Sequence, residues 1–269
     1  MTKYFEMNVK SLLTNPYLIF WSILFIEFWI FMWVFVFGNE IPPLEEYVRR
    51  YMASAYGNLL ILSLSGACVT IGGSILYSSK SIRYVTKYTR LSPSRFLFEN
   101  LASSLVVLLT VCVVMLLSIM ALFCSKFALF IMPVNPAGLA GSLLLSTLFI
   151  YALSLFLNLL IVTLRAPESA NFISFLPLIF GFISYSALWI DFKAAVYVPP
   201  FNCITSICYF AASGEIPPAG NFFALGGQTL VDVNLALISL IAWTVVLILI
   251  DVLLLRKMRG VGVEEIRTA

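Results

Sequence analysis

Long apolar runs separated by short polar gaps dominate this sequence. Six runs are long enough to cross a membrane as α-helices, because about 20 mainly apolar residues cover a hydrocarbon core of roughly 30 Å. The six predicted spans cover residues 17–38, 56–78, 98–123, 138–164, 172–190 and 233–255. The runs do not alternate polar and apolar residues, which favours helices over a barrel. The pattern predicts an all-α integral membrane protein whose residues 1–269 form a single transmembrane domain.

Composition supports a membrane protein and narrows its chemistry. Hydrophobic residues make up 61% of the 269 positions and charged residues only 11%, which excludes an ordinary soluble domain. The chain has no histidine, so a Ser-His triad and a His-metal site are excluded. A disulfide between Cys203 and Cys208 is conceivable, but we interpret the five cysteines as apolar filler. We predict no catalytic residues, no metal site and no enzyme activity in this chain.

The positive charges indicate a topology. Cytosolic loops of membrane proteins carry the excess of Lys and Arg. With both termini in the cytosol, the inner side holds Lys3, Lys10, Lys80, Arg83, Lys87, Arg90, Arg95, Arg165, Arg256, Lys257, Arg259 and Arg267. The outer side then holds only Arg49, Arg50, Lys126 and Lys193. We therefore predict a multi-pass protein of the plasma membrane, with residues 256–269 as a cytosolic tail and the first span retained rather than cleaved as a signal peptide.

The first fifteen residues have the pattern of an amphipathic helix. Phe5, Val9 and Leu12 share one helical face, opposite Lys3 and Lys10. Such a segment is expected to lie flat on the inner membrane surface, although a loose terminus remains the alternative. Asn15 is predicted to cap the next helix and Pro16 to occupy its first position. The pair Asn135-Pro136 is interpreted in the same way at the fourth span.

The gap between the second and third spans is strongly basic. Lys80, Arg83, Lys87 and Arg90 are spaced three, four and three residues apart, which places them on one stripe of a helix. We predict a cytosolic amphipathic helix over 79–92, followed by Ser92 and Pro93 as the start of the third span. The stripe can contact anionic lipid headgroups, a partner protein, or both.

Residues 191–230 form a long segment rich in Pro and Gly on the predicted outer side. Pro199-Pro200 precede an apolar stretch over 201–212, which is too short to span the membrane. Such a stretch can form a re-entrant or interfacial hairpin, provided that protein or water covers its irregular backbone.

Acidic and aromatic residues within the spans are candidates for a substrate path. Glu27 lies near the middle of the first span and Asp251 lies in the last. Glu27 either lines a transport route or is a protonated acid bonded to a neighbouring helix, and Asp251 can reach toward the basic end of its helix. Trp21 and Phe28 belong to a ring-rich first span that either stacks on substrate or packs against helices and lipid. We predict Glu27, Trp21 and Phe28 as path residues.

Together these features resemble a permease of the type 2 ATP-binding-cassette (ABC) exporter family. The resemblance covers essentially the whole chain and rests on three parts: the amphipathic start ending in Asn15-Pro16, the basic segment running into Arg90-Leu91-Ser92-Pro93-Ser94-Arg95, and the Pro199-Pro200 hairpin before the last span. It implies that residues 1–15 are the connecting helix and 79–92 the coupling helix, on which a separate ATPase docks. The implied ATPase contacts are Lys80, Arg83, Lys87, Arg90 and Arg95. The acidic, glycine-containing run that many relatives have before the proline is replaced here by Ser, Tyr and Lys.

The chain has no nucleotide site of its own. A phosphate-binding loop needs a Gly-rich turn ending in Gly-Lys-Ser or Gly-Lys-Thr, and Ser79-Lys80-Ser81 lacks the glycine. The expected transporter is therefore a homodimer of this permease with two ATPase subunits that bind ATP and Mg²⁺, exporting a hydrophobic or amphipathic substrate such as a drug, a lipid or a glycan-linked molecule by alternating access. The alternative is a six-helix channel or secondary carrier that needs no ATPase. No nucleic-acid partner is expected.

Overall fold

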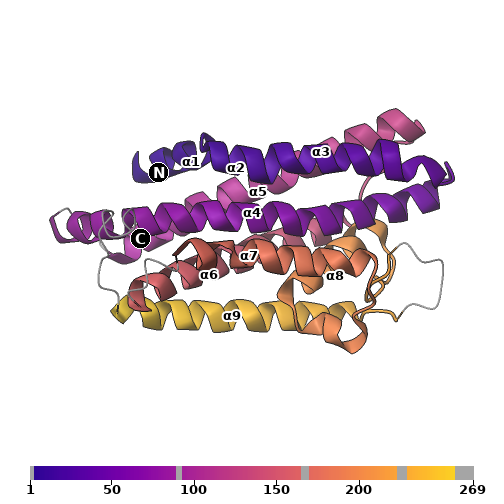
Figure 1. Ribbon diagram of the computed structural model, residues 1–269. Coiled ribbons are helices and arrows are strands. Elements are labelled where there is room, and N and C mark those ends of the chain that lie inside the picture. The colour runs from indigo at the N-terminus through magenta and orange to yellow at the C-terminus, as the bar shows by residue number, and fades with distance from the viewer. Residues whose placement is uncertain (1–2, 89–92, 165–169, 223–228, 258–269) are drawn as a thin grey trace.

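The protein is an elongated bundle of helices, seen in a computed structural model (Figure 1). The structure describes the backbone of residues 3–88, 93–164, 170–222 and 229–257, and the side chains of these residues except 74–88, 93–97, 171 and 255–257. Helices are the regular elements of this described part, where only isolated β-bridges join extended segments. The prediction of an all-helical membrane-type fold is confirmed at this level.

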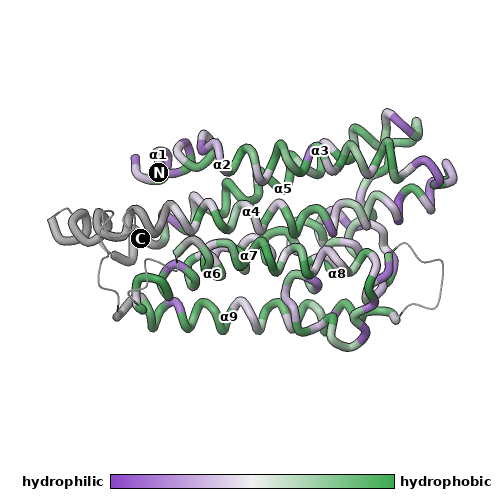
Figure 2. Tube along the Cα trace, in the orientation of Figure 1, coloured by the Kyte–Doolittle hydropathy of each residue, from purple (hydrophilic) through white to green (hydrophobic). Residues whose placement is uncertain are grey.

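Five helical segments are long and apolar enough to cross a membrane. They are Pro16–Glu40, Glu45–Gly73 within α4 (Glu45–Tyr88), Phe98–Phe127 within α5 (Pro93–Phe127), α6 (Pro136–Leu164), and Val233–Leu254 within α9 (Val233–Lys257). The apolar segment Phe172–Leu188 is shorter and comprises most of α7 (Ala170–Tyr185) and a 3₁₀ turn, Ser186–Leu188. Hydropathy follows this division, with green along the helices and purple mainly at the ends and loops (Figure 2). The long apolar helices indicate a multi-pass membrane protein.

Two ends of the bundle can be told apart. α1 (Lys3–Leu13) and the C-terminal end of α9 lie at one end, which we call the terminal end (Figure 1). The opposite end, which we call the distal end, carries the start of α4 and the loops around α8 (Pro200–Ser213). α1 packs on α5, where Asn8 Nδ2 bonds to Ser103 Oγ at 2.5 Å and Leu12 is buried.

Predicted capping residues begin two of the spanning segments. Asn15 Oδ1 accepts a hydrogen bond from the Tyr17 amide at 2.9 Å, directly before Pro16. Asn135 Oδ1 likewise accepts from the Gly138 amide at 2.8 Å, directly before Pro136. α5 begins at Pro93 as expected, while Ser92 lies outside the described residues. Both caps occupy amides that a helix leaves without a partner at its N-terminus, so these predictions are confirmed.

The first spanning segment is helical throughout but changes its winding. α2 (Pro16–Leu18) leads into a π-helical stretch, Ile19–Leu24, then α3 (Phe25–Phe31), a second π-helical stretch, Met32–Val36, and a 3₁₀ turn, Phe37–Glu40. Lys126 of α5 binds the distal end of the first spanning segment. Its Nζ donates to the Val34 carbonyl at 2.6 Å and to Asn39 Oδ1 at 2.8 Å. A cation at the C-terminal end of a helix stabilises the carbonyls left without partners there.

α4 differs from the sequence prediction at both ends. It begins at Glu45 rather than near 56, because Glu45 and Glu46 pair with Arg49 and Arg50 one turn later and extend the helix beyond its apolar run. It also continues to Tyr88, so residues 79–88 are the last turns of α4 and not a separate coupling helix. Residues 89–92 of that predicted helix lie outside the described part of the chain.

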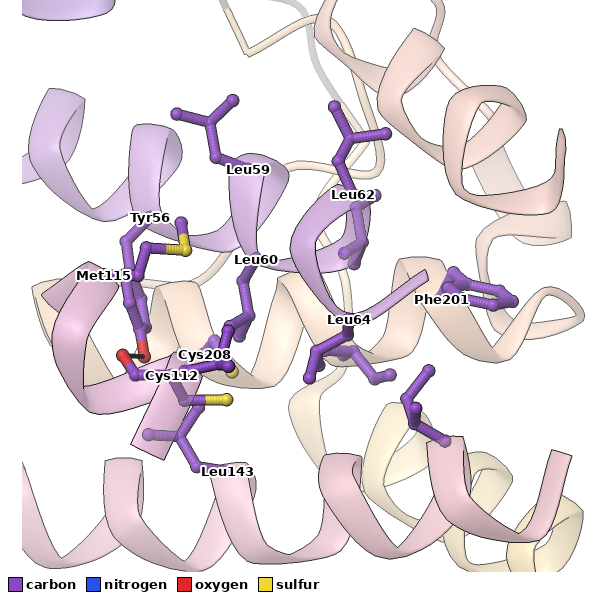
Figure 3. Packing of buried hydrophobic residues seen from close by; sticks show 14 of the residues in the cluster. Tyr56, Leu59, Leu60, Leu62, Leu64, Cys112, Met115, Leu143, Phe201 and Cys208 are labelled. Carbon is purple, nitrogen blue, oxygen red and sulfur yellow. Dashed lines mark hydrogen bonds between the residues drawn. The ribbon is translucent and has the colours of Figure 1, made fainter. Parts of the chain in front are cut away.

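The core of the bundle surrounds α4, which packs against α5, α6, α7 and α8. In Figure 3, Leu60 of α4, Cys112 of α5, Leu143 of α6 and Cys208 of α8 converge, and Tyr56 donates a hydrogen bond to the Cys112 carbonyl at 3.4 Å. Cys203 and Cys208 are both free and buried, as expected for apolar filler.

The segment 191–230 contains a short helix rather than only irregular chain. α8 starts at Pro200, packs against α4, α6 and α9, and ends at Gly214, whose φ of 77° gives the left-handed turn that favours glycine. Nearly all of its fourteen residues are buried by protein. Arg50 of α4 ties the following loop to the bundle through Glu215 at 2.6 Å.

Candidate functional site

The predicted ATPase-contact residues divide between two helices at the terminal end. Lys80, Arg83 and Lys87 lie in the last turns of α4, and Arg95 lies in the first turn of α5. Their side chains, and Arg90 as a whole, are outside the described residues. Since α4 ends and α5 begins at this end of the bundle, the backbone brings the predicted basic residues to one end, the end that also carries α1 (Figure 1).

The predicted path residues of the first span lie away from the two cavities described below. Trp21 is 37% exposed, Phe28 is 57% exposed, and Glu27 is half-buried in α3. Trp21 packs toward Gly66 of α4, while Phe28 stacks edge-on against Trp29. None of the three lines either cavity described below. A transport role for them stays a prediction.

A large aromatic pocket instead lies toward the distal end. Its volume is about 1100 Å³, and it opens between the end of the first spanning segment, the start of α4 and the end of α7. Its aromatic lining consists of Trp29, Trp33, Phe37, Tyr47, Tyr51, Tyr185 and Trp189. We call this cavity the aromatic pocket.

Hydrogen bonds and ring contacts hold the inner wall of the aromatic pocket. Trp33 is buried, and its Nε1 donates to the Tyr185 hydroxyl at 3.3 Å. The Tyr51 hydroxyl donates to the Trp33 carbonyl at 2.9 Å, with the two ring centroids 5.2 Å apart. Trp189 meets Tyr185 edge to face at 5.8 Å and is itself 62% exposed. The pocket therefore has a fixed floor, made of three linked rings, and an accessible aromatic rim.

The lining of the aromatic pocket carries one acidic side chain among several tyrosine hydroxyl and tryptophan N–H groups. Glu40 and Asn39 lie on its lining, and no Lys or Arg is among the residues that line it. Lys126 lies nearby, but its ammonium group is bound to Asn39 and to the Val34 carbonyl. Ring faces with a nearby carboxylate suit planar groups and organic cations, by stacking and by cation–π attraction. The arrangement can bind such a group without any covalent chemistry.

Asp251 is buried among the helices. It is 3% exposed and lines a small cavity together with residues of α5 and α6, and its predicted reach toward the basic end of its own helix stays a prediction. The side chains of Arg256 and Lys257 are outside the described residues. Burial beside another helix is a tertiary effect, because a single helix leaves the direction of a side chain open to lipid, water or protein.

The sequence contained only part of the signal for the aromatic pocket. The sequence shows that the first span is rich in aromatic rings. Because these rings lie on every side of the helix, the sequence does not indicate which face packs against protein. Trp33 and Trp29 come within reach of Tyr51 and Tyr185 only because α4 packs beside the first span and α7 packs on α4. The partial signal was the four-residue spacing of Trp29 and Trp33, which places both side chains on one helical face.

Comparisons with other proteins add no identification. No protein-family model, no curated protein and no solved structure gives a significant match to the chain.

Proposed function

We propose that this chain is the transmembrane permease subunit of an ABC-type exporter, which moves an amphipathic substrate with a ring or a cationic group across the membrane. The observation that carries the proposal is the aromatic pocket of about 1100 Å³, framed by membrane-type helices at one end of the bundle. Its size is at the upper limit of small-molecule sites, which occupy roughly 300–1,000 Å³. The resemblance in sequence supplies the second support, since it covers the basic segment at the other end.

In this proposal the terminal end faces the cytosol and the distal end faces outward. α7 and its following turn act as the fifth of the six spans, although the seventeen residues of Phe172–Leu188 reach only about 26 Å as a helix. α8 is the outer re-entrant element, shielded by α4, α6 and α9. Two copies of the chain and two ATPase subunits complete the transporter, and ATP with Mg²⁺ binds to the ATPase alone.

Co-purification tests the ATPase partnership. The detergent-solubilised protein should carry a nucleotide-binding subunit, and the paired change Arg83→Glu with Lys87→Glu should release it, because charge reversal turns attraction into repulsion. Lys3→Glu with Lys10→Glu is the matched control, since both lysines are exposed on α1 at the same end. If no such subunit is recovered from cells, or if both pairs release it equally, the ATP-driven proposal fails.

Transport assays test the aromatic pocket itself. Trp189→Leu removes an exposed rim ring and should lower transport of a cationic aryl dye from loaded vesicles by about fivefold, as expected for losing one ring contact of roughly 1 kcal/mol. Trp243→Leu, on α9 and 40% exposed, is the control and should retain transport. Equal transport by the two variants would show that the aromatic pocket does not lie on the substrate route.

An ATPase-independent channel or carrier is the second candidate. It is favoured by the presence of two acidic side chains, Glu27 and Asp251, within spanning segments, where carboxyl groups commonly serve ion-coupled transport. Transport that persists without nucleotide and collapses with the proton or sodium gradient would select this candidate. Full transport by Glu27→Gln would exclude Glu27 from either mechanism.

A further inference from the structure

A second, smaller cavity lies on the lateral surface of the bundle, between α5, α6 and α9. Its volume is about 190 Å³, and its lining includes Leu101 of α5, Tyr151 and Leu155 of α6, and Ile248, Asp251 and Val252 of α9. Tyr151 and Asp251 are buried at its base, whereas Ile248 and Val252 on its wall are 38% and 44% exposed. We call this cavity the lateral groove, because its apolar walls open on a face that the bundle does not cover.

The base of the lateral groove carries a buried carboxyl oxygen without a hydrogen bond. Asp251 is 3% exposed, and its Oδ1 has no partner among the described residues. Leaving a buried polar group without a partner is costly, and for a charged group the cost is larger still. Native membrane proteins keep such groups where a ligand, an ion or a proton can satisfy them.

The neighbouring Tyr151 leaves the base of the lateral groove rich in acceptors. Its hydroxyl donates to Asn100 Oδ1 at 3.1 Å, so its proton is directed away from Asp251. A hydroxyl that donates once still has lone pairs to accept with. A ligand in the lateral groove therefore meets a carboxyl group and a phenol oxygen at its base, and aliphatic side chains along its walls.

We propose that the lateral groove binds a single-chain amphiphile with a protonated primary amine, whose ammonium group donates to Asp251 and whose alkyl chain lies along the walls of α5 and α9. An ammonium has three donors and matches a base made of acceptors. A calcium ion requires six to eight oxygen ligands, and the two side-chain groups at this base are far short of that number. The volume is below that of sites for drug-sized ligands, so the groove holds a headgroup and the first carbons of a chain.

A bilayer phospholipid with an amine headgroup fits less well. Its phosphate lies only an ethylene unit away from the ammonium and would bring a negative charge close to Asp251, between walls made mainly of apolar residues. Like charges at short range in an apolar setting repel strongly. A single-chain amine carries no such phosphate. The inference concerns binding alone and does not depend on whether an ATPase drives the protein.

Binding of dodecylamine to the full-length protein in phosphatidylcholine nanodiscs tests this proposal, with empty nanodiscs as the blank. The expected result is saturable binding of one molecule per chain. Asp251→Asn should weaken it by at least about tenfold, because a charge-assisted hydrogen bond is lost. Dodecanol, which has the same chain without the charge, should compete at least about tenfold less well. Equal binding by Asp251→Asn, or equal competition by dodecanol, overturns the proposal.

A pair of wall variants keeps the test informative if Asp251→Asn does not fold. Ile248→Trp places a large ring in the lateral groove and should abolish saturable binding. Ile241→Trp is the matched control, two turns earlier on α9 and similarly exposed at 43%, and should bind as the unaltered protein does. Equal binding by the two variants contradicts the proposal. Displacement of dodecylamine by phosphatidylethanolamine in the nanodisc also contradicts it, because that result would identify the lateral groove as a phospholipid site.

Discussion

α4 and α9 are both long helices of the membrane-type bundle, yet they have opposite surroundings. In the most apolar stretch of α4, 94% of the residues are buried inside the protein, against 22% in α9. The buried helix is the less hydrophobic of the two, and among the five long segments it is the least hydrophobic. Figure 2 shows the difference in colour, with pale and purple residues interrupting α4 and mostly green residues along α9.

The contrast shows what holds the helices together. Lipid tails are as apolar as leucine, so burying leucine between helices gains little from the hydrophobic effect, and contact depends on close packing and on hydrogen bonds. α4 accordingly carries Gly57, Ser63 and Ser65 at buried positions, while α9 presents Ile238, Leu249 and other apolar residues outward. Hydropathy therefore identifies membrane helices without identifying the core helix.

The largest expected difference in the free energy of unfolding comes from truncating one leucine to alanine on each of the two helices. Leu60→Ala in α4 should lower the free energy of unfolding by about 2–5 kcal/mol, because it leaves a cavity in a fully buried site. Leu249→Ala in α9, where the side chain is 60% exposed, should change it by less than about 0.5 kcal/mol. Unfolding in detergent with a chemical denaturant measures both. Equal losses would mean that α9 is also packed, for example against a second copy.

Added bulk should separate the same two environments. A Cβ at Gly57 would lie 3.1 Å from the Thr205 carbonyl oxygen, where the backbone of α8 passes α4. Gly57→Val should therefore cost about 1–3 kcal/mol by forcing the helices apart. Gly141→Val on α6 is the control, since nothing lies within 4 Å of its Cβ. Thermal unfolding of the two variants compares them, and a tolerated Gly57→Val would contradict the close packing of α8 on α4.

A polar contact within the bundle should have a smaller effect. The Ser63 hydroxyl donates to the Ser22 carbonyl at 2.8 Å and joins α4 to the first spanning segment. Ser63→Ala should cost about 0.6 kcal/mol, the mean for interhelical hydrogen bonds in a membrane. Ser125→Ala, which removes a bond made within α5 itself, is the comparison and should cost less. The free energies of unfolding, measured in the same detergent, decide between them.

The weakest expected effect lies outside the spans and depends on pH. The Lys193 amide and the Thr229 hydroxyl, each 2.8 Å from Asp191 Oδ1, hold the pKa of that carboxyl below its usual value. Its contribution is therefore present above about pH 3.9, the usual pKa, and is lost as the pH falls through the lower pKa of the folded protein. Because the group is partly exposed, the loss should stay under about 0.5 kcal/mol. Asp191→Asn should remove this part of the acid dependence of unfolding; an unchanged acid profile would contradict the contact.

Local signals in the sequence predicted the helix starts well. Asn15-Pro16 and Asn135-Pro136 combine a capping side chain with a residue that has no amide hydrogen, and both begin helices as expected. The early start of α4 also had a local signal, in Glu45 and Glu46 four residues before Arg49 and Arg50. The apolar run alone does not include these charged turns, although paired charges extend a helix at a membrane surface.

Which side chains meet was decided by packing. The candidate path residue Phe28 is 57% exposed, whereas Trp33 bonds to Tyr185, 152 positions away in the sequence. Asp251 lies in the lateral groove beside Tyr151, a contact between helices from distant parts of the chain. Long-range contacts of this kind depend on the rotation of each helix about its own axis, and nearly uniform apolar runs contain little information about that rotation.

The sequence by itself determined that the chain forms membrane-type helices, about where they begin, and that basic residues gather between the second and third apolar runs. These properties follow from residue hydropathy, capping and charge, each of which acts within a few residues. Only the tertiary structure decided that α4 is the core, that seven rings from three segments surround one pocket, and that Asp251 is buried. Those properties depend on which helix faces meet, and in a lipid-like setting small differences in packing and hydrogen bonding decide this rather than hydrophobicity.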